Sequence, residues 1–169
     1  MPFSLFGSTS RGTAEVDFWT WFAANKAQLF SCETDREAIF DKVGDALHKV
    51  HPDLTFEFGP VAEGRREFVI SADGVKAAFP LVESLYGSAP TLERWTWVKF
   101  RPRRLPIGTI KFAGKSIPSN DVHFLLASDE PKVGIVLFFD GCNEKEKNVF
   151  GQIGYLFLDE ALGEYAVEM

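Results

Sequence analysis

The sequence predicts an α+β fold, with a largely antiparallel sheet, helices packed mainly on one face and the element order ααββαββββα. Three observations predict it. Apolar residues recur at helical spacing near both ends of the chain, short β-rich segments follow one another in the middle, and no repeat or low-complexity linker interrupts them. A chain of 169 residues can bury roughly 70% of its unfolded surface in one core. We therefore expect an irregular arm over 1–12 and a single α+β domain over 13–169.

Two helices are expected at the start of the domain. Thr13 can cap a helix over about 13–30, whose first turn is acidic and whose apolar residues follow the helical period. Thr34 followed by Glu37 matches a capping box before a continuous apolar stripe. This pattern predicts the second helix near 34–50.

A hairpin and a third helix follow. The segments 54–58 and 67–71 are rich in β-formers, and the polar stretch Gly59–Arg66 between them is typical of a hairpin loop. Helical spacing returns over about 75–87, where Pro80 is tolerated only in the first turn.

The second half of the sequence predicts strands and a closing helix. Asn143 with Glu146 three residues later resembles a helix start, and Gly163 is a suitable helix end. The helix between them is expected near 144–162. The strands are expected near 95–100, 108–112, 121–128 and 132–139.

Composition and charge exclude several classes of function. The net charge of −6 and the pI near 5.1 argue against a general attraction to nucleic acid or to anionic lipid. No segment approaches the roughly 20 apolar residues of a membrane helix, and the N-terminus lacks the pattern of an export signal. Cys32 and Cys142 are far apart and form no CxxC pair, which indicates free thiols in a reducing cytosol. We therefore expect a cytoplasmic bacterial protein.

The common catalytic and cofactor motifs are absent from the sequence. It contains no Gly-x-Ser-x-Gly elbow and no glycine-rich phosphate loop, so no cofactor is expected. His48 and His51 could face one metal ion, but no further ligand is near, and polar or cationic residues are also favoured at helix ends. No metal site is expected. Cys142 is the more plausible reactive cysteine, because a helix N-terminus just after it would lower the pKa of its thiol.

Two sets of residues are candidates for function. Trp95 and Trp97 lie on one face of a strand that ends in a basic run, and together they could hold a planar anionic ligand or an acidic peptide. A solubilising strand end with an edge-protecting proline explains the same pattern. The candidate binding residues are Trp95, Trp97, Lys99, Arg101, Arg103 and Arg104. The alternative is a catalytic site assembled from Glu57, Asp121 and His123 on neighbouring strands.

Four short segments resemble signatures of an uncharacterised bacterial protein family, over about residues 54–168. They are Ser71-Ala72-Asp73-Gly74, Ala89-Pro90 followed by Trp95, Lys99-Phe100-Arg101-Pro102-Arg103, and Leu162-Gly163-Glu164-Tyr165. The resemblance implies a compact bacterial domain. It implies no activity and no catalytic residue.

The function that the sequence favours is a non-enzymatic cytosolic binding or protein-interaction module. Its partner would be an unidentified protein or a small anionic ligand, with no nucleic acid and no membrane involved. The alternative is a hydrolase or a transferase with a site assembled from separate strands. The sequence does not indicate an oligomeric state.

Overall fold

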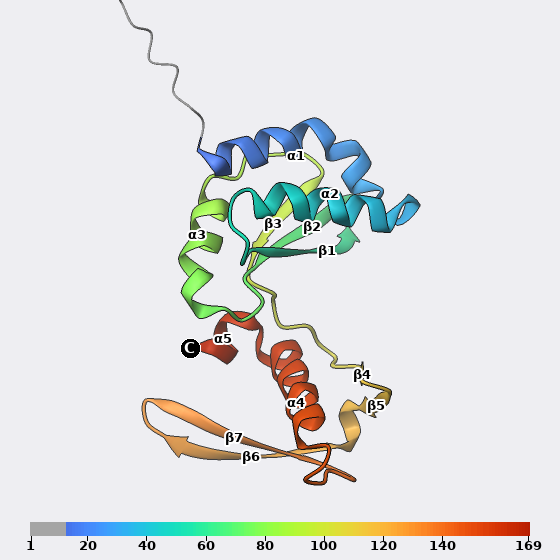
Figure 1. Ribbon diagram of the computed structural model, residues 1–169, viewed down its shortest axis with the longest axis vertical. Helices are drawn as coiled ribbons and strands as arrows, with labels where there is room; N and C mark the ends of the chain where they lie inside the picture. Colours follow the sequence, from blue (N-terminus) through green and yellow to red (C-terminus); the bar gives the residue numbers. More distant parts are fainter. Residues whose placement is uncertain (1–12) are drawn as a thin grey trace, which may run out of the picture. The chain divides into compact units, whose positions relative to one another are not determined.

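The computed structural model describes residues 13–169 and has a mixed α+β fold (Figure 1). The α+β class and the approximate order of the elements confirm the prediction from sequence. The arm expected over 1–12 lies outside the described residues. The chain divides into two compact units, one ending at Phe100 and the other beginning at Arg101, and each is described by itself. A single domain over 13–169 stays a prediction.

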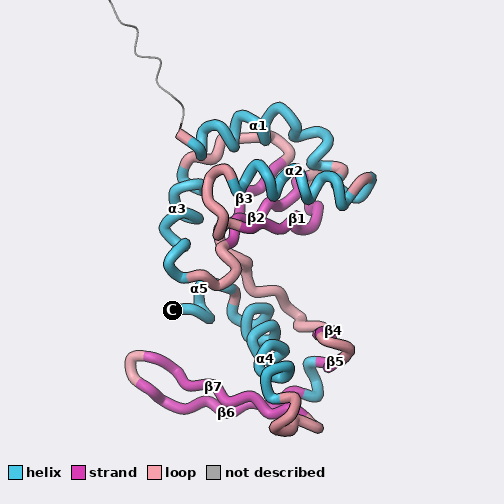
Figure 2. The backbone as a smooth tube through the Cα atoms, viewed as in Figure 1, coloured by secondary structure: helices cyan, strands magenta, loops and turns pink. Residues whose placement is uncertain are grey.

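The N-terminal unit combines three helices with a three-stranded sheet (Figure 2). Its sheet has the order β1-β2-β3, with β1 antiparallel to β2 and β3 parallel to β2. The parallel pair arises because α3 connects the two strands as a crossover. The elements are α1 (Ala14–Phe30), α2 (Arg36–His48), β1 (Thr55–Ala62), β2 (Arg65–Ser71), α3 (Phe79–Gly87) and β3 (Trp95–Lys99).

Aromatic side chains fill the core of the N-terminal unit. Phe22 of α1 packs edge-on against Phe68 of β2, with ring centroids 4.9 Å apart. Trp95 and Trp97 are stacked 5.9 Å apart with an interplanar angle of 9°, because alternate residues of β3 point to the same face. Phe22 lies within 4.8 Å of the Trp95 ring and 5.2 Å of the Trp97 ring. The face of the sheet that carries the two tryptophans is therefore the face that α1 covers.

Several local predictions are confirmed and others are wrong. The Thr13 hydroxyl caps α1 by accepting a hydrogen bond from the Val16 N–H at 3.4 Å, as expected. Thr34 does not form the expected capping box: its hydroxyl donates to the Ser31 carbonyl at 2.8 Å, inside a 3-10 turn. The loop expected over Gly59–Arg66 is also wrong, because β1 and β2 continue to a two-residue turn.

The two-residue turn explains why β1 and β2 are longer than expected. Their polar ends were predicted as a loop, but they continue the strand pairing up to the turn. Glu63 and Gly64 have φ values of 51° and 76°. Two successive left-handed residues are typical of the hairpin turns whose twist matches that of the strands. The polar residues before and after the turn therefore belong to the strand ends.

The C-terminal unit contains two hairpins and two helices (Figure 1). Two of its elements, β5 and α5, were not predicted from the sequence, and both are only four or five residues long. No helix in the described part of the chain has both the length and the apolar character needed to cross a membrane. The elements are β4 (Thr109–Phe112), β5 (Lys115–Pro118), β6 (Val122–Asp129), β7 (Lys132–Phe139), α4 (Lys147–Leu162) and α5 (Glu164–Glu168).

Candidate functional site

The hairpin of β6 and β7 has apolar residues on both faces. The strands pair in antiparallel register from Val122 opposite Phe139 to Asp129 opposite Lys132, and residues that pair across the two strands point to the same face. One face, here called the helix face, carries the pairs Val122–Phe139, Phe124–Leu137, Leu126–Ile135 and Ser128–Val133. The other, here called the open face, carries His123–Phe138, Leu125–Val136 and Ala127–Gly134, with Lys132 on the same face beside the turn.

Helix α4 packs against the helix face at the base of the hairpin, which is the end opposite its turn. The Phe139 ring lies 5.6 Å from the Phe150 ring and 6.1 Å from the Phe157 ring. Gly154 allows this close approach, since a Cβ atom there would stand 3.3 Å from the Leu137 Cδ1 atom. The turn of the hairpin extends beyond α4 (Figure 2), so the helix anchors the hairpin without covering all of it.

An open groove of about 300 Å³ runs between β7 and α4. Its walls are mostly apolar, and they include Ile135, Leu137, Cys142, Phe150, Gly154 and Tyr155. Lys147 also lines the groove, so its walls combine apolar side chains with one positive charge.

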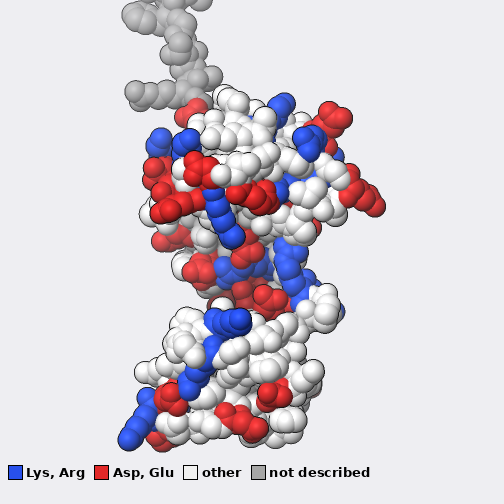
Figure 3. Space-filling view, turned by 90° about the vertical axis from the view of Figure 1, so that its right-hand side faces the viewer, with Lys and Arg blue, Asp and Glu red and all other residues white. Residues whose placement is uncertain are grey.

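The uncovered apolar surface of the hairpin is large. Six side chains are between 48% and 63% exposed: Phe124, Leu125, Leu126, Val133, Val136 and Phe138. Three of them, Phe124, Leu126 and Val133, lie on the helix face, and the other three lie on the open face. Each set presents roughly 300 Å² of apolar surface, which is within the range of the largest patch on a monomeric protein. On the face drawn in Figure 3, charged side chains of both signs are spread over the N-terminal unit, and uncharged surface takes up much of the C-terminal unit.

A signal of this surface is present in the sequence, although the candidate sites predicted from the sequence do not include it. Residues 124–127 are consecutively apolar, and so are residues 133–139 apart from Gly134. Strands with one wetted face alternate apolar and polar residues, whereas near-continuous apolar runs are typical of strands covered on both faces. The hairpin has the sequence of a strand pair covered on both faces, whereas among residues 13–169 a single helix, α4, packs on it.

The two candidate tryptophans of β3 lie in or against the core of the N-terminal unit. Trp95 is 2% exposed, and the Trp97 indole N–H donates to the Pro90 carbonyl at 2.6 Å. Lys99 is exposed and pairs with Glu83 of α3 at 2.8 Å. The two indole rings thus lie side by side, as expected, but both rings pack against aromatic side chains of α1.

The three arginines of the basic run belong to the C-terminal unit. The Arg101 guanidinium Nε donates to Asp159 Oδ2 at 2.8 Å, and the Arg101 backbone N–H donates to Glu164 Oε2 at 2.9 Å. Arg104 donates its backbone N–H to the Glu160 carbonyl at 2.8 Å, and the Arg103 side chain is exposed. Arg101 therefore ties its segment to the end of α4, and a ligand site at the basic run stays a prediction.

Gly163 is needed where this segment meets the junction of α4 and α5. It has a φ of +84°, and a Cβ atom there would stand 3.0 Å from the Arg101 carbonyl and 3.0 Å from the Arg103 backbone nitrogen. Both the left-handed backbone and the close approach favour glycine. The prediction that Gly163 ends the last long helix is confirmed.

The alternative catalytic residues lie in different units. Glu57 is half-buried on β1 of the N-terminal unit. Asp121 ends a 3-10 turn just before β6, and His123 lies on the open face of the hairpin, with both side chains exposed. A site built from these three residues stays a prediction.

The contacts of His51 and the position of Cys142 bear on the metal and thiol hypotheses. His51 Nδ1 accepts a hydrogen bond from the Asp53 N–H at 3.2 Å, which fits a role at a helix end. Among residues 13–169, no cluster of three or more His, Cys, Asp or Glu side chains could hold a metal ion. The expected helix start directly after Cys142 is wrong, because α4 begins at Lys147 and the residues between form a turn. The reason given for a reactive thiol at this position therefore falls away.

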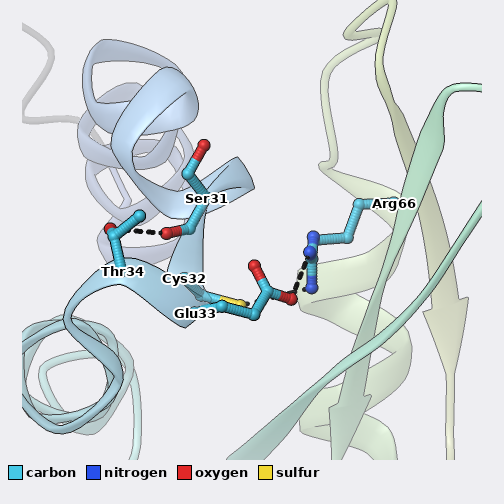
Figure 4. A network of polar contacts seen from close by, with 5 residues as sticks. All are labelled: Ser31, Cys32, Glu33, Thr34 and Arg66. Carbon is cyan, nitrogen blue, oxygen red and sulfur yellow. Dashed lines mark hydrogen bonds and ion pairs between the residues drawn. The ribbon is translucent and has the colours of Figure 1, made fainter.

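In the N-terminal unit, a cluster of polar side chains connects the end of α1 and the 3-10 turn after it to β2 (Figure 4). Arg66, which is 6% exposed, donates to Cys32 Sγ at 3.2 Å and to Glu33 Oε1 at 2.5 Å. Burial raises the pKa of the Cys32 thiol, and the hydrogen bond from Arg66 lowers the pKa of the Glu33 carboxyl. A protonated, buried thiol is a poor nucleophile, so we interpret this cluster as a structural link.

The ring of Phe30 completes that link. Its centroid lies 5.5 Å from the Arg66 guanidinium carbon and 3.6 Å from that of Arg94. Beside it is a pocket of about 150 Å³ whose lining includes Lys26, Arg94 and Trp95. This pocket is half the size of the groove on the C-terminal unit, and the Arg94 side chain is already engaged with Phe30.

Comparisons of this chain with protein-family models, with curated proteins and with solved structures found no match. Its function must therefore be inferred from the geometry described above.

Proposed function

We propose that the protein is an interaction module, without catalytic activity, that binds other protein surfaces through the β6–β7 hairpin. The observation that carries the proposal is the apolar character of both hairpin faces, of which α4 covers only part. Exposed apolar surface is unfavourable in water by about 25 cal/mol for each Å². A partner that covers the hairpin would remove this cost, and contiguous patches of this size commonly mark binding sites.

The way the hairpin is held supports the same function. A two-stranded hairpin is marginally stable in water by itself, but α4 packs on it through Phe150, Phe157 and the close contact at Gly154. The strands are therefore fixed at one end and presented at the other. A preorganised apolar surface loses little conformational entropy when it binds.

Site-specific photocrosslinking tests the proposal. A photoreactive amino acid is placed at Leu125 or Phe124, and at Leu105 as a control, which is 58% exposed and lies outside the hairpin. We expect discrete crosslinked protein species from the two hairpin positions and none from Leu105. Adding Val136→Asp, on the same face, to the chain that carries the photoreactive residue at Leu125 should remove these species. Equal crosslinking from all three positions would contradict the proposal.

A further inference from the structure

We propose that the partner on the open face is a second copy of this chain, with the two hairpins stacked face to face across a two-fold axis. This inference rests on the proposed function and names the partner of the same surface. Most soluble oligomers are symmetric pairs that use one surface patch twice, so the patch must be complementary to itself. The open face has that property.

Side chains on the open face become smaller over three successive cross-strand pairs, and the charged Lys132 follows them beside the turn. The cross-strand pairs run from His123–Phe138 through Leu125–Val136 to Ala127–Gly134. If two hairpins stack in opposite directions, the bulky pair of one copy lies over the small pair of the other. Leu125 and Val136 then meet their own counterparts at the axis. Packed layers interdigitate when large side chains of one layer face small side chains of the other.

The chain's own fold does not require glycine at position 134 on the open face. Gly134 is not among the residues with positive φ, and a Cβ atom added there would make only an ordinary contact of 3.5 Å with the Ala127 Cβ atom. The hairpin by itself would therefore accept a side chain at this position. Glycine inside a strand weakens it and often marks a place where another chain approaches closely.

The size of the open face fits a reversible dimer. Leu125, Val136 and Phe138 are 61%, 51% and 48% exposed, and with Ala127 and His123 the face offers roughly 500 Å² in each copy. A face-to-face dimer would bury about 1,000 Å² in total, which is the lower limit for specific interfaces. We therefore expect a dissociation constant in the micromolar range.

Sedimentation velocity of the full chain, from about 1 to 200 µM, tests the inference. The wild-type protein should change from monomer to dimer over this range. The Gly134→Val variant should raise the dissociation constant about tenfold or more, because its side chain fills the space that the Phe138 ring of the other copy needs. Its midpoint of unfolding as a monomer should be unchanged or higher, because a β-branched residue suits a strand. Ser128→Val is the control, since it places the same β-branched side chain near the same turn but on the helix face, and it should leave the dimer intact.

A disulfide at the proposed axis gives a second measurement that does not depend on Gly134. In a Cys142→Ser background, Val136→Cys should crosslink to its own counterpart under mild oxidation, and Ser128→Cys should not. Cys32 is buried and is present in both variants.

The outcomes separate this inference from the proposed function. A wild-type protein that stays monomeric to about 200 µM, or a Gly134→Val dimer as tight as wild type, overturns the inference. If the hairpin positions then still crosslink specifically to a different protein, the proposed function stands without it. A monomer whose hairpin gives no specific crosslink overturns both.

Discussion

Two arginines only two positions apart have different surroundings, and this difference allows a test of their role. Arg101 donates from Nε to Asp159 at 2.8 Å, and both side chains are about one-fifth exposed. Arg103 is exposed. A partly buried, charge-assisted hydrogen bond contributes more to stability than an exposed ion pair does.

We expect Arg101→Ala to lower the free energy of unfolding by about 1–2 kcal/mol, and Arg103→Ala to change it by less than about 0.5 kcal/mol. Chemical denaturation followed by circular dichroism measures both variants. If both are as stable as wild type but bind a polyanion more weakly than wild type does, the basic run is a ligand site instead.

The link between Glu33 and Arg66 predicts a dependence of stability on pH. The hydrogen bond from Arg66 lowers the folded-state pKa of Glu33 below its ordinary value of 4.5. Glu33 therefore contributes stability that is fully present above pH 4.5 and is lost as the pH falls through its folded pKa. We expect wild type to be more stable than Glu33→Gln at pH 6, and this difference in stability to disappear as the pH falls below 4.5. Urea midpoints measured across this range would contradict the idea if the difference stayed constant.

At the scale of whole elements, the packing of α4 on the hairpin depends on one glycine. An added Cβ atom at Gly154 would stand 3.3 Å from Leu137 and 3.6 Å from Phe139, whereas at Gly151 of the same helix it would meet nothing within 4 Å. Overpacking a close contact typically costs 1–3 kcal/mol. We expect Gly154→Val to be less stable than Gly151→Val by about that amount, measured by chemical denaturation. Equal stabilities would show that the hairpin can move away from α4 without cost.

The helices were the elements that the sequence predicted best. The helical period and the Thr13 cap located α1 to within one residue, and Pro80 lies in the first turn of α3 as expected. These signals are local, because they depend on residues three or four positions apart. The start of α4 was placed too early because Asn143 and Glu146 do interact, at 2.8 Å, but in a turn before the helix.

The positions of the strands along the sequence were predicted well. Which strands pair with each other was predicted much less well. Nothing local to residues 95–99 specifies that β3 pairs in parallel with β2, because pairing depends on where α3 returns the chain. The candidate site was missed for a related reason. The aromatic residues of β3 resemble a binding surface by type, yet burial decides their role, and Trp95 is in the core. The better signal was the loss of alternation along β6 and β7.

At the scale of the whole molecule, the two units bury very different amounts of apolar surface. The hydrophobic core cluster lies entirely between Phe18 and Phe100. Beyond Arg101, in the described part of the chain, the buried hydrophobic residues are Phe150, Ile153 and Phe157. Since apolar burial is the dominant favourable contribution to folding, the N-terminal unit should be the more stable of the two.

Unfolding is therefore expected to occur in two steps that separate probes can follow. All four tryptophans lie between positions 19 and 97, so their fluorescence reports on the N-terminal unit. A fluorophore on the exposed Cys142 reports on the C-terminal unit, because Cys32 is buried and its thiol has a raised pKa. We expect the fluorophore signal to change at a lower denaturant concentration than the tryptophan fluorescence, whereas coincident transitions would support one cooperative domain over 13–169.

If the hairpin pairs two copies, a higher protein concentration should raise the midpoint of the fluorophore transition alone, because a partner that binds only the folded unit stabilises that unit by mass action. A tryptophan midpoint that rose equally with concentration would contradict an interface confined to the hairpin.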